Sequence, residues 1–235
     1  MIMRLAWRAV LAAIAIVAGF AQIDRSSRFN PQLAPYVPAA FSGFAAAQRT
    51  RQAVAAQQPE RALAEAKALV AARPLPAENL QYLAIAAALN DQTEQSIAAI
   101  EAASTRGWRA PIVQQALAQA ALEQGAYDSA AQRITALFAT DSAPEAALVL
   151  AGRLLATPEG QAAMARRFAA PGHWQDNAMQ KLGGSIPAAD FAAMLILTAE
   201  QGGSVNCSRL RNTISRFERE GAAGPSAQLK AICPN

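Results

Sequence analysis

Small and apolar residues recur through the middle of the chain at the three- and four-residue spacing of helices that bury one face. The positions of this kind within residues 77–105 are Leu80, Leu83, Ala84, Ala87, Ile97, Ile100 and Ala103. Asn90 and Asp91 interrupt the pattern, and Gly107 follows its end, where glycine commonly terminates a helix. The spacing predicts a hairpin of two short helices, residues 77–89 and 92–105.

The same pattern returns 34 residues later in the chain. Residues that correspond at this step include the pairs Leu83 and Leu117, Ala84 and Ala118, Ala87 and Ala121, Ser96 and Ala130, and Ile100 and Ile134. The step also leads from Pro74 to Trp108 and Ser142. A repeat of this length predicts a helix-turn-helix solenoid. Extending the frame over residues 43–178 gives the units 43–76, 77–110, 111–144 and 145–178.

This pattern resembles the tetratricopeptide repeat. In that family small residues fall where the two helices of one hairpin approach closely, and Ala84, Ala118 and Gly152 occupy such positions here. A larger side chain would push the helix backbones apart. The resemblance implies a solenoid in which the first helix of each unit lines a concave groove.

Both ends of the chain depart from this frame. Arg49 and Thr50 occupy core positions of the first unit, and Pro171 falls within the second helix of the fourth, so both units are expected to be degenerate or capping repeats. Residues 25–42 contain three prolines and predict an extended arm that packs against another surface. Residues 179–235 predict a C-terminal cap of further helical hairpins. With no alternating strand pattern, the fold class is all-α.

Residues 1–24 are expected to be a signal peptide or a signal-anchor. Arg4 and Arg8 precede an uncharged, almost wholly apolar run over residues 9–23. A helix of that length spans about 22 Å, less than the roughly 30 Å of a bilayer core, which favours a cleaved signal peptide. Gly19-Phe20-Ala21 would then supply the small residues of a cleavage site.

Other features favour a retained anchor. Leu5 and Trp7 extend the apolar run to residues 5–23, and the two arginines obey the positive-inside tendency. We therefore favour a single-pass inner-membrane protein with the bulk of the chain in the periplasm. If the leader is cleaved, the remainder is periplasmic. A buried core helix is the third alternative.

The two cysteines, Cys207 and Cys233, lie 26 positions apart near the end of the sequence. One begins a predicted helix and the other follows the last helix, so in an exported protein they predict a disulfide that joins a terminal hairpin. Closing such a loop contributes about 3 kcal/mol in the chain-entropy model. The alternative is a pair of buried free thiols. Because no further Cys or His lies nearby at ligand spacing, we predict no metal site.

Motifs for catalysis are sparse. The single histidine, His173, lies beside Trp174 and Asp176 in a predicted turn, and no G-x-S-x-G motif accompanies it. Gly183-Gly184-Ser185 is a loop and not a phosphate cradle, because no strand precedes it and no lysine follows in position. We therefore predict neither an enzyme nor a cofactor. Trp174 is expected to plug the end of the repeat stack.

The formal net charge of +4 and the isoelectric point near 9.5 raise the question of an acidic partner. An exported domain meets no genome, so no nucleic acid is expected. Cationic residues in the second half of the chain offer a possible contact with anionic lipid or an acidic polymer. They are Arg166, Arg167, Arg209, Arg211, Arg216 and Arg219. The alternative, which we favour, is a solvated face with Glu218 and Glu220 interleaved.

Counting along the repeat frame places long polar side chains on the concave groove, and we predict that they bind a protein partner. These residues are Arg51, Glu78, Gln81, Gln115, Gln119 and Arg153. The expected function is that of a non-catalytic scaffold, an accessory or assembly subunit of a cell-envelope complex such as polysaccharide export machinery.

Two alternatives belong to other classes. A solenoid that binds carbohydrate needs exposed aromatic side chains on the groove, where the frame offers only Phe44. A glycan-active helical enzyme needs two carboxylates that face one cleft, and the frame leaves only Glu78.

Overall fold

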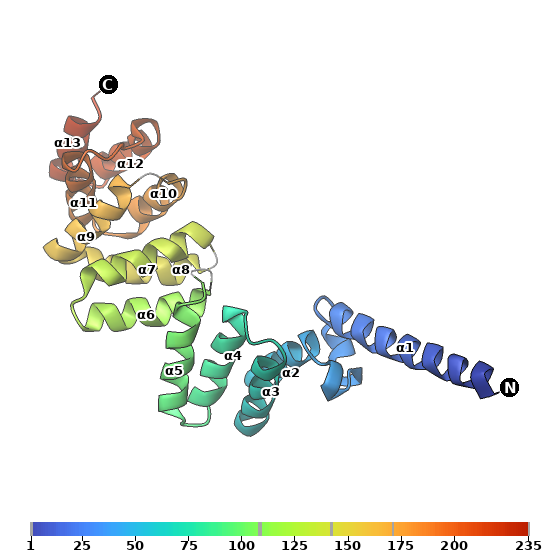
Figure 1. The fold of residues 1–235 in the computed structure, drawn as a ribbon. Coiled ribbons are helices and arrows are strands. Elements are labelled where there is room, and N and C mark those ends of the chain that lie inside the picture. Colours follow the sequence, from blue (N-terminus) through green and yellow to red (C-terminus); the bar gives the residue numbers. More distant parts are fainter. Residues whose placement is uncertain (1, 108–109, 142, 171, 235) are drawn as a thin grey trace. The chain divides into compact units, whose positions relative to one another are not determined.

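The computed structural model describes residues 2–107, 110–141, 143–170 and 172–234 (Figure 1). These residues form helices and no strand, so the all-α prediction is confirmed. The chain divides into two compact units, residues 1–110 and 111–235. Trp108, Ser142 and Pro171, which entered the sequence frame, lie outside the described residues.

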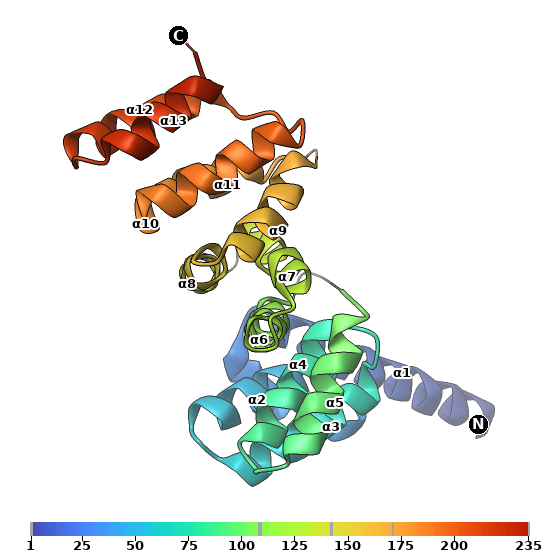
Figure 2. The same ribbon diagram turned by 90° about the vertical axis from the view of Figure 1, so that its left-hand side faces the viewer.

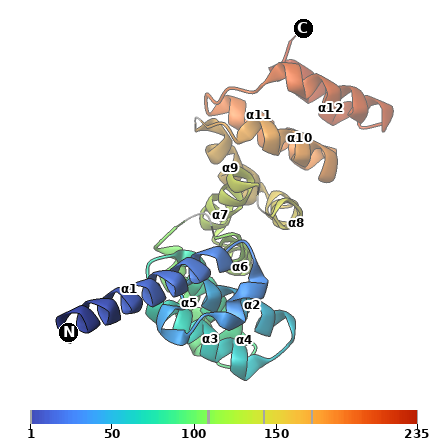
Figure 3. The same ribbon diagram turned by 90° about the vertical axis from the view of Figure 1, so that its right-hand side faces the viewer.

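The first unit contains one long helix, two short 3₁₀ helices and two helical hairpins. They are α1 (Ile2–Ser27), η1 (Pro31–Tyr36), η2 (Ala39–Phe41), α2 (Phe44–Ala55), α3 (Pro59–Ala72), α4 (Ala77–Ala88) and α5 (Thr93–Ser104). Helix α2 pairs with α3 and α4 pairs with α5, as the 34-residue frame predicts. Figure 3 shows that α1 projects away from the other helices of its unit.

The second unit continues with helices only. They are α6 (Pro111–Glu123), α7 (Tyr127–Thr140), α8 (Pro144–Leu155), α9 (Pro158–Ala169), α10 (Gln175–Ser185), α11 (Ala188–Glu200), α12 (Cys207–Arg219) and α13 (Ala223–Ile232). Helices α6 and α7 form the third hairpin of the frame. Figure 2 shows α12 and α13 side by side at the end of this unit.

The turn inside each of the first three hairpins has the same backbone geometry, and this geometry recurs every 34 residues. Gln57, Asp91 and Gly125 all adopt the left-handed conformation, with φ of 52°, 58° and 68°. In each turn the next amide donates a hydrogen bond of 2.8–2.9 Å to an alanine carbonyl five residues earlier. This is the Schellman arrangement, which satisfies carbonyls at the end of the first helix. The structural repeat therefore includes residues 43–76, where the sequence match was weak.

The fourth unit does not repeat this turn. Thr157 has an extended backbone and caps α9 by accepting a hydrogen bond from the amide of Gly160 at 3.1 Å. Helix α9 packs mainly against α7 and α11 rather than against α8. A side chain at Gly152 would meet only Ile186 at ordinary contact distance, 3.8 Å, so the expected close approach of two hairpin helices is absent there. Residues 145–178 are a degenerate unit in this sense.

Each unit has its own apolar core. In the first unit the core between α2, α3 and α4 consists mostly of alanine, including Ala53, Ala62 and Ala87. Such small side chains let helices approach closely. In the second unit a larger cluster runs from Ala118 to Cys233 and includes the fully buried Phe191.

Residues 25–42 do not form an extended arm. Helix α1 continues to Ser27, and the proline-containing segment then folds into η1 and η2. Pro31 begins η1, where its missing N–H costs nothing, and the buried Ala34 and Val37 pack with Ala45 at the start of α2. The extended conformation was wrong, and the side chains expected to pack divide: Val37 is buried and Phe41 is partly buried, whereas Phe29 and Tyr36 are exposed.

The predicted cysteine pair is at bonding distance. The sulfur atoms of Cys207 and Cys233 are joined, with Cα atoms 5.4 Å apart. The bridge connects the start of α12 to the end of α13. Between the same helices, the Lys230 ammonium donates a hydrogen bond to Glu218, and this contact lowers the pKa of the Glu218 carboxyl below its ordinary value.

Candidate functional site

The junction between α1 and α2 is built around a buried carboxylate, Asp24. Its Oδ1 accepts hydrogen bonds from the amides of Gly43 at 3.0 Å and Ala45 at 2.8 Å, and its Oδ2 accepts one from Phe44 at 3.2 Å. Helix α2 has no side-chain cap of its own, so these amides would otherwise be orphaned. Asp24 thus caps a helix that begins about twenty residues later in the chain.

The opposite end of the junction is capped in return. Gln48, buried on α2, donates its Nε2 to the carbonyl of Ser27, the last residue of α1, at 3.1 Å and to the carbonyl of the next residue, Arg28, at 3.0 Å. Phe20 stacks on Phe41 of η2, with ring centroids 5.5 Å apart. The last two turns of α1 therefore pack against the start of the first repeat and the segment before it.

The charged residue Arg49 occupies a core position of the first repeat, residues 43–76, because neighbouring groups accept the hydrogen bonds of its guanidinium. Its Nε donates to the Glu65 carboxylate on α3 at 2.8 Å, and its two terminal nitrogens donate to the Ala34 carbonyl at 2.9 Å and to Ser42 Oγ at 2.6 Å. One guanidinium on α2 thus joins η1, the residue at the end of η2, and α3. The buried Thr50 hydroxyl donates to the Ala46 carbonyl at 2.8 Å, so its polar group is also satisfied.

A pocket of about 320 Å³ opens beside this junction, on the first helices of the first two hairpins. Its lining residues are Arg28, Phe44, Ala47, Gln48, Arg51, Arg73, Pro76, Glu78, Asn79 and Tyr82. We call it the arginine pocket. Three of these residues are arginines and one is an acid, so the lining carries an excess of positive charge.

The arginines of this pocket lie over its aromatic rings. The guanidinium carbons of Arg73 and Arg28 lie 4.0 and 5.7 Å from the centroid of Phe44, and that of Arg51 lies 5.2 Å from the centroid of Tyr82. Arg51 also donates a hydrogen bond to the Tyr82 hydroxyl. Of the ion pairs among the described residues, none involves these three arginines. The faces of Phe44 and Tyr82 contribute to the stabilisation of these charges.

The groove residues predicted from the sequence fall into three groups. Arg51 and Glu78 line the arginine pocket. Gln81 is buried and does not belong to an open groove, and its Oε1 has no hydrogen-bond partner among the described residues. In the second unit, Gln115 and Gln119 on α6 and Arg153 on α8 are exposed.

Apolar side chains accompany the polar ones on this face of the second unit. Val149 is 66% exposed and Ile112 is 44% exposed. Ile112, Gln115 and Gln119 follow one another at the spacing of a single helix face, as do Val149 and Arg153. Helices α6 and α8 contact each other, and we refer to these five exposed residues of the two helices together as the α6–α8 face.

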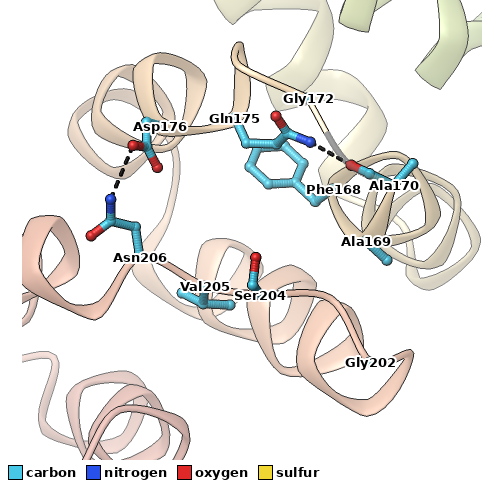
Figure 4. A pocket seen from close by; sticks show the side chains of 10 residues that line it. All are labelled: Phe168, Ala169, Ala170, Gly172, Gln175, Asp176, Gly202, Ser204, Val205 and Asn206. Atoms are coloured by element: carbon cyan, nitrogen blue, oxygen red, sulfur yellow. Dashed lines mark hydrogen bonds between the residues drawn. The ribbon is translucent and has the colours of Figure 1, made fainter.

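A second hollow, of about 440 Å³, lies among α9, α10 and the loop before α12 (Figure 4). Asp176 is engaged there: it accepts a hydrogen bond from Asn206 Nδ2 at 3.0 Å and pairs with Arg209 at 3.4 Å. Gln175 donates to the Ala170 carbonyl. These contacts connect α10 to its neighbours and leave no free acid or base in the lining.

The structure also places the other residues that the sequence singled out. His173 is exposed. The half-buried Trp174 packs edge-on against Phe168, with ring centroids 4.8 Å apart, and so fills the core beneath α9. It does not plug the end of the stack, because α10–α13 follow it. Within the described residues no group of three potential ligands is placed to hold a metal ion. On α12, Arg209 and Arg216 are paired with Asp176 and Glu220.

The long-range cap and the arginine pocket were not found from the sequence. The signal that could have found the cap is a single acid, Asp24, which ends the apolar run about twenty residues before Gly43-Phe44, where α2 begins without a side-chain cap of its own. No family model, curated protein or solved structure matches the chain.

Proposed function

We propose that this chain is a membrane-anchored helical-repeat scaffold whose apolar helix is retained in the mature protein and whose repeats bind a protein partner. The observation that carries this proposal is the reciprocal capping between α1 and α2. Asp24 and Gln48 tie the end of α1 to the first repeat. An anchor joined in this way holds the repeats close to the membrane surface.

The properties of α1 support the anchor. Among the described residues it is the one helix long and apolar enough to cross a membrane, and its most apolar stretch is not buried against the rest of the chain. The proposed cleavage site at Gly19-Phe20-Ala21 lies inside the continuous helix, and Phe20 is engaged with Phe41. Arg4 and Arg8 favour an N-terminus inside the cell, with the repeats in the periplasm.

The α6–α8 face supports the choice of a protein partner. Exposed apolar residues among hydrogen-bonding side chains are the composition of a protein-binding surface, where apolar anchors supply affinity and polar groups supply orientation. A partner helix or an extended peptide of an envelope complex would suit it. The tetratricopeptide resemblance favours the same function.

The other classes find less support. Carbohydrate stacking needs free aromatic faces, and those of Phe44 and Tyr82 are covered by guanidinium groups. Glycan hydrolysis needs two carboxylates in one cleft, and the arginine pocket contributes Glu78 alone.

The test is purification of a C-terminally tagged chain from the membranes of its native cells after in-cell crosslinking. The intact mass should correspond to a chain that retains α1, and one envelope protein should be recovered in stoichiometric amount. Val149→Glu places a charge on the α6–α8 face and should reduce that recovery at least about tenfold. Gln132→Ala, an exposed change on α7, should leave it unchanged. A mature chain that begins after Ala21, or equal recovery by the Val149 variant, would contradict the proposal.

A further inference from the structure

The arginine pocket lies at the membrane end of the first unit. The apolar run of α1 ends at Ile23, and Arg28 follows five residues later, about 7.5 Å further at helical rise. The headgroup layer on each side of a bilayer is about 5–8 Å thick, which is the difference between total and hydrocarbon thickness. Because Phe20 packs on Phe41 and Asp24 caps α2, the hydrocarbon boundary lies nearer to Phe20, about 12 Å before Arg28 at helical rise, so the long Arg28 side chain lies within reach of the headgroups when α1 spans the membrane.

A wall of the pocket is fixed at this depth by hydrogen bonds. Phe44, over whose ring Arg28 and Arg73 lie, donates its amide to Asp24 on the last turns of α1. At Gly43 an added Cβ would approach Arg73 Cδ to 2.9 Å, so the absence of a side chain there lets Arg73 lie close to the junction. The pocket cannot move away from the end of the anchor without breaking the cap.

Three arginines and a single acid, Glu78, line the arginine pocket. The guanidinium carbons of Arg28 and Arg73 lie 5.7 and 4.0 Å from one ring centroid, so the two positive charges are at most about 9.7 Å apart. Neither forms an ion pair among the described residues. A phosphate between them would relieve their repulsion, and guanidinium groups bind phosphate oxygens with two parallel hydrogen bonds.

Exposed apolar side chains flank these arginines in the sequence. Phe29 is 82% exposed next to Arg28, and Leu75 is 82% exposed between Arg73 and Pro76. Tyr36 on η1 is 72% exposed. Aromatic residues favour the membrane interface, so these side chains suit contact with lipid better than contact with water.

We propose that the arginine pocket binds the phosphate of an anionic phospholipid, with Arg28 and Arg73 holding the phosphate and Arg51 and Tyr82 contacting the polar headgroup. This proposal rests on the retention of α1 in the proposed function. It assigns lipid recognition to the first unit and leaves the α6–α8 face for the protein partner. The arginines of α12, considered above for lipid contact, are in part neutralised by Asp176 and Glu220.

The experiment is titration of the purified full chain, in a neutral detergent, with phosphatidylglycerol or phosphatidylcholine, read by native mass spectrometry. Phosphatidylglycerol should bind in one copy and phosphatidylcholine at least tenfold more weakly. Each arginine near an anionic lipid contributes about fivefold in affinity, so the double variant Arg28→Gln with Arg73→Gln should lose about 25-fold. The matched control, Arg211→Gln with Arg219→Gln, removes two exposed arginines from α12 and should change nothing.

Two competitions, the comparison of the two lipids and one further pair of substitutions separate this proposal from its rivals. Displacement of the lipid by sodium phosphate at equal concentration would assign the pocket to a free anion, and displacement by a glutamate-rich peptide would assign it to an acidic protein; either result overturns the lipid. Equal binding of the two lipids overturns it as well. If the glutamine variant misfolds, the Arg28→Lys, Arg73→Lys pair decides, since it keeps the charge and should retain the lipid preference with weaker binding. These readouts require neither partner recovery nor the mature mass, so each proposal can fail alone.

Discussion

At the scale of single residues, the most consequential side chain is Asp24. By sequence it ends an apolar segment, where a charged residue usually marks the membrane boundary. In the structure its carboxylate is buried and accepts three backbone amides at the start of α2. One residue therefore both ends the anchor and begins the repeats.

We predict that Asp24→Ala destabilises the start of α2 by about 2 kcal/mol, because it leaves partly buried amides without an acceptor. Amide hydrogen exchange of the full chain in detergent should then be about 30-fold faster at residues 43–45. Asp24→Asn keeps an acceptor oxygen and should show a smaller effect. Glu101→Ala, which removes an exposed carboxylate from α5, serves as the control. Unchanged exchange at residues 43–45 in the alanine variant would mean that the cap is dispensable.

At the scale of elements, the feature that repeats most closely is the backbone geometry of the hairpin turns. In each of the three hairpins the residue in the turn after the first helix has the same left-handed conformation, yet only the third hairpin has glycine there. Gln57 and Asp91 adopt this conformation at a cost that glycine avoids. The turn geometry is retained although two of its residues disfavour it, because the packing of the hairpin helices determines the chain path.

A reciprocal pair of substitutions tests this account. Gln57→Gly should raise the free energy of unfolding of the first unit by about 0.5–1 kcal/mol, and Gly125→Gln should lower that of the second by about 1 kcal/mol. An added Cβ at Gly125 meets no atom within 4 Å, so backbone strain alone is measured there. Denaturant unfolding followed by circular dichroism provides the values. The two substitutions should change the free energy of unfolding in opposite directions. A change in the same direction would contradict a shared role of the turns.

At the scale of the whole molecule, the chain consists of two units with separate cores. The alanine-rich cluster of the first unit involves residues 53–87, and the cluster of the second involves residues 118–233. The second unit also contains the disulfide, whose loop closure contributes about 3 kcal/mol to a terminal hairpin.

The second unit is therefore expected to fold by itself. A fragment of residues 111–235, with its disulfide formed, should show by circular dichroism the helix content that these residues have in the structure. It should also unfold in a cooperative transition. Trp174 is the only tryptophan in this fragment, and its contact with Phe168 should give a near-ultraviolet signal that is lost on unfolding. Helical signal without that near-ultraviolet band would indicate an unpacked core and contradict the prediction.

Local and periodic features of this protein followed from the sequence alone. The 34-residue period, the helix pairs over residues 43–144, the helices of the C-terminal cap and the cysteine pair were all predicted, because each depends on spacing along the chain or on residues that end a helix. Of the groove residues, Arg51 and Glu78 were assigned to a surface that the structure shows as a pocket.

Only the tertiary structure decided the remainder. The 3₁₀ helices in place of an extended arm, the burial of Gln81, the cap by Asp24 and the convergence of Arg28, Arg51 and Arg73 on two aromatic rings depend on residues that lie up to about fifty positions apart. A period constrains neighbours within a helix and between adjacent repeats. It carries no information about which distant polar group satisfies an orphaned amide or which cations share a ring, since these contacts are fixed by packing geometry and by the need to pair buried polar atoms.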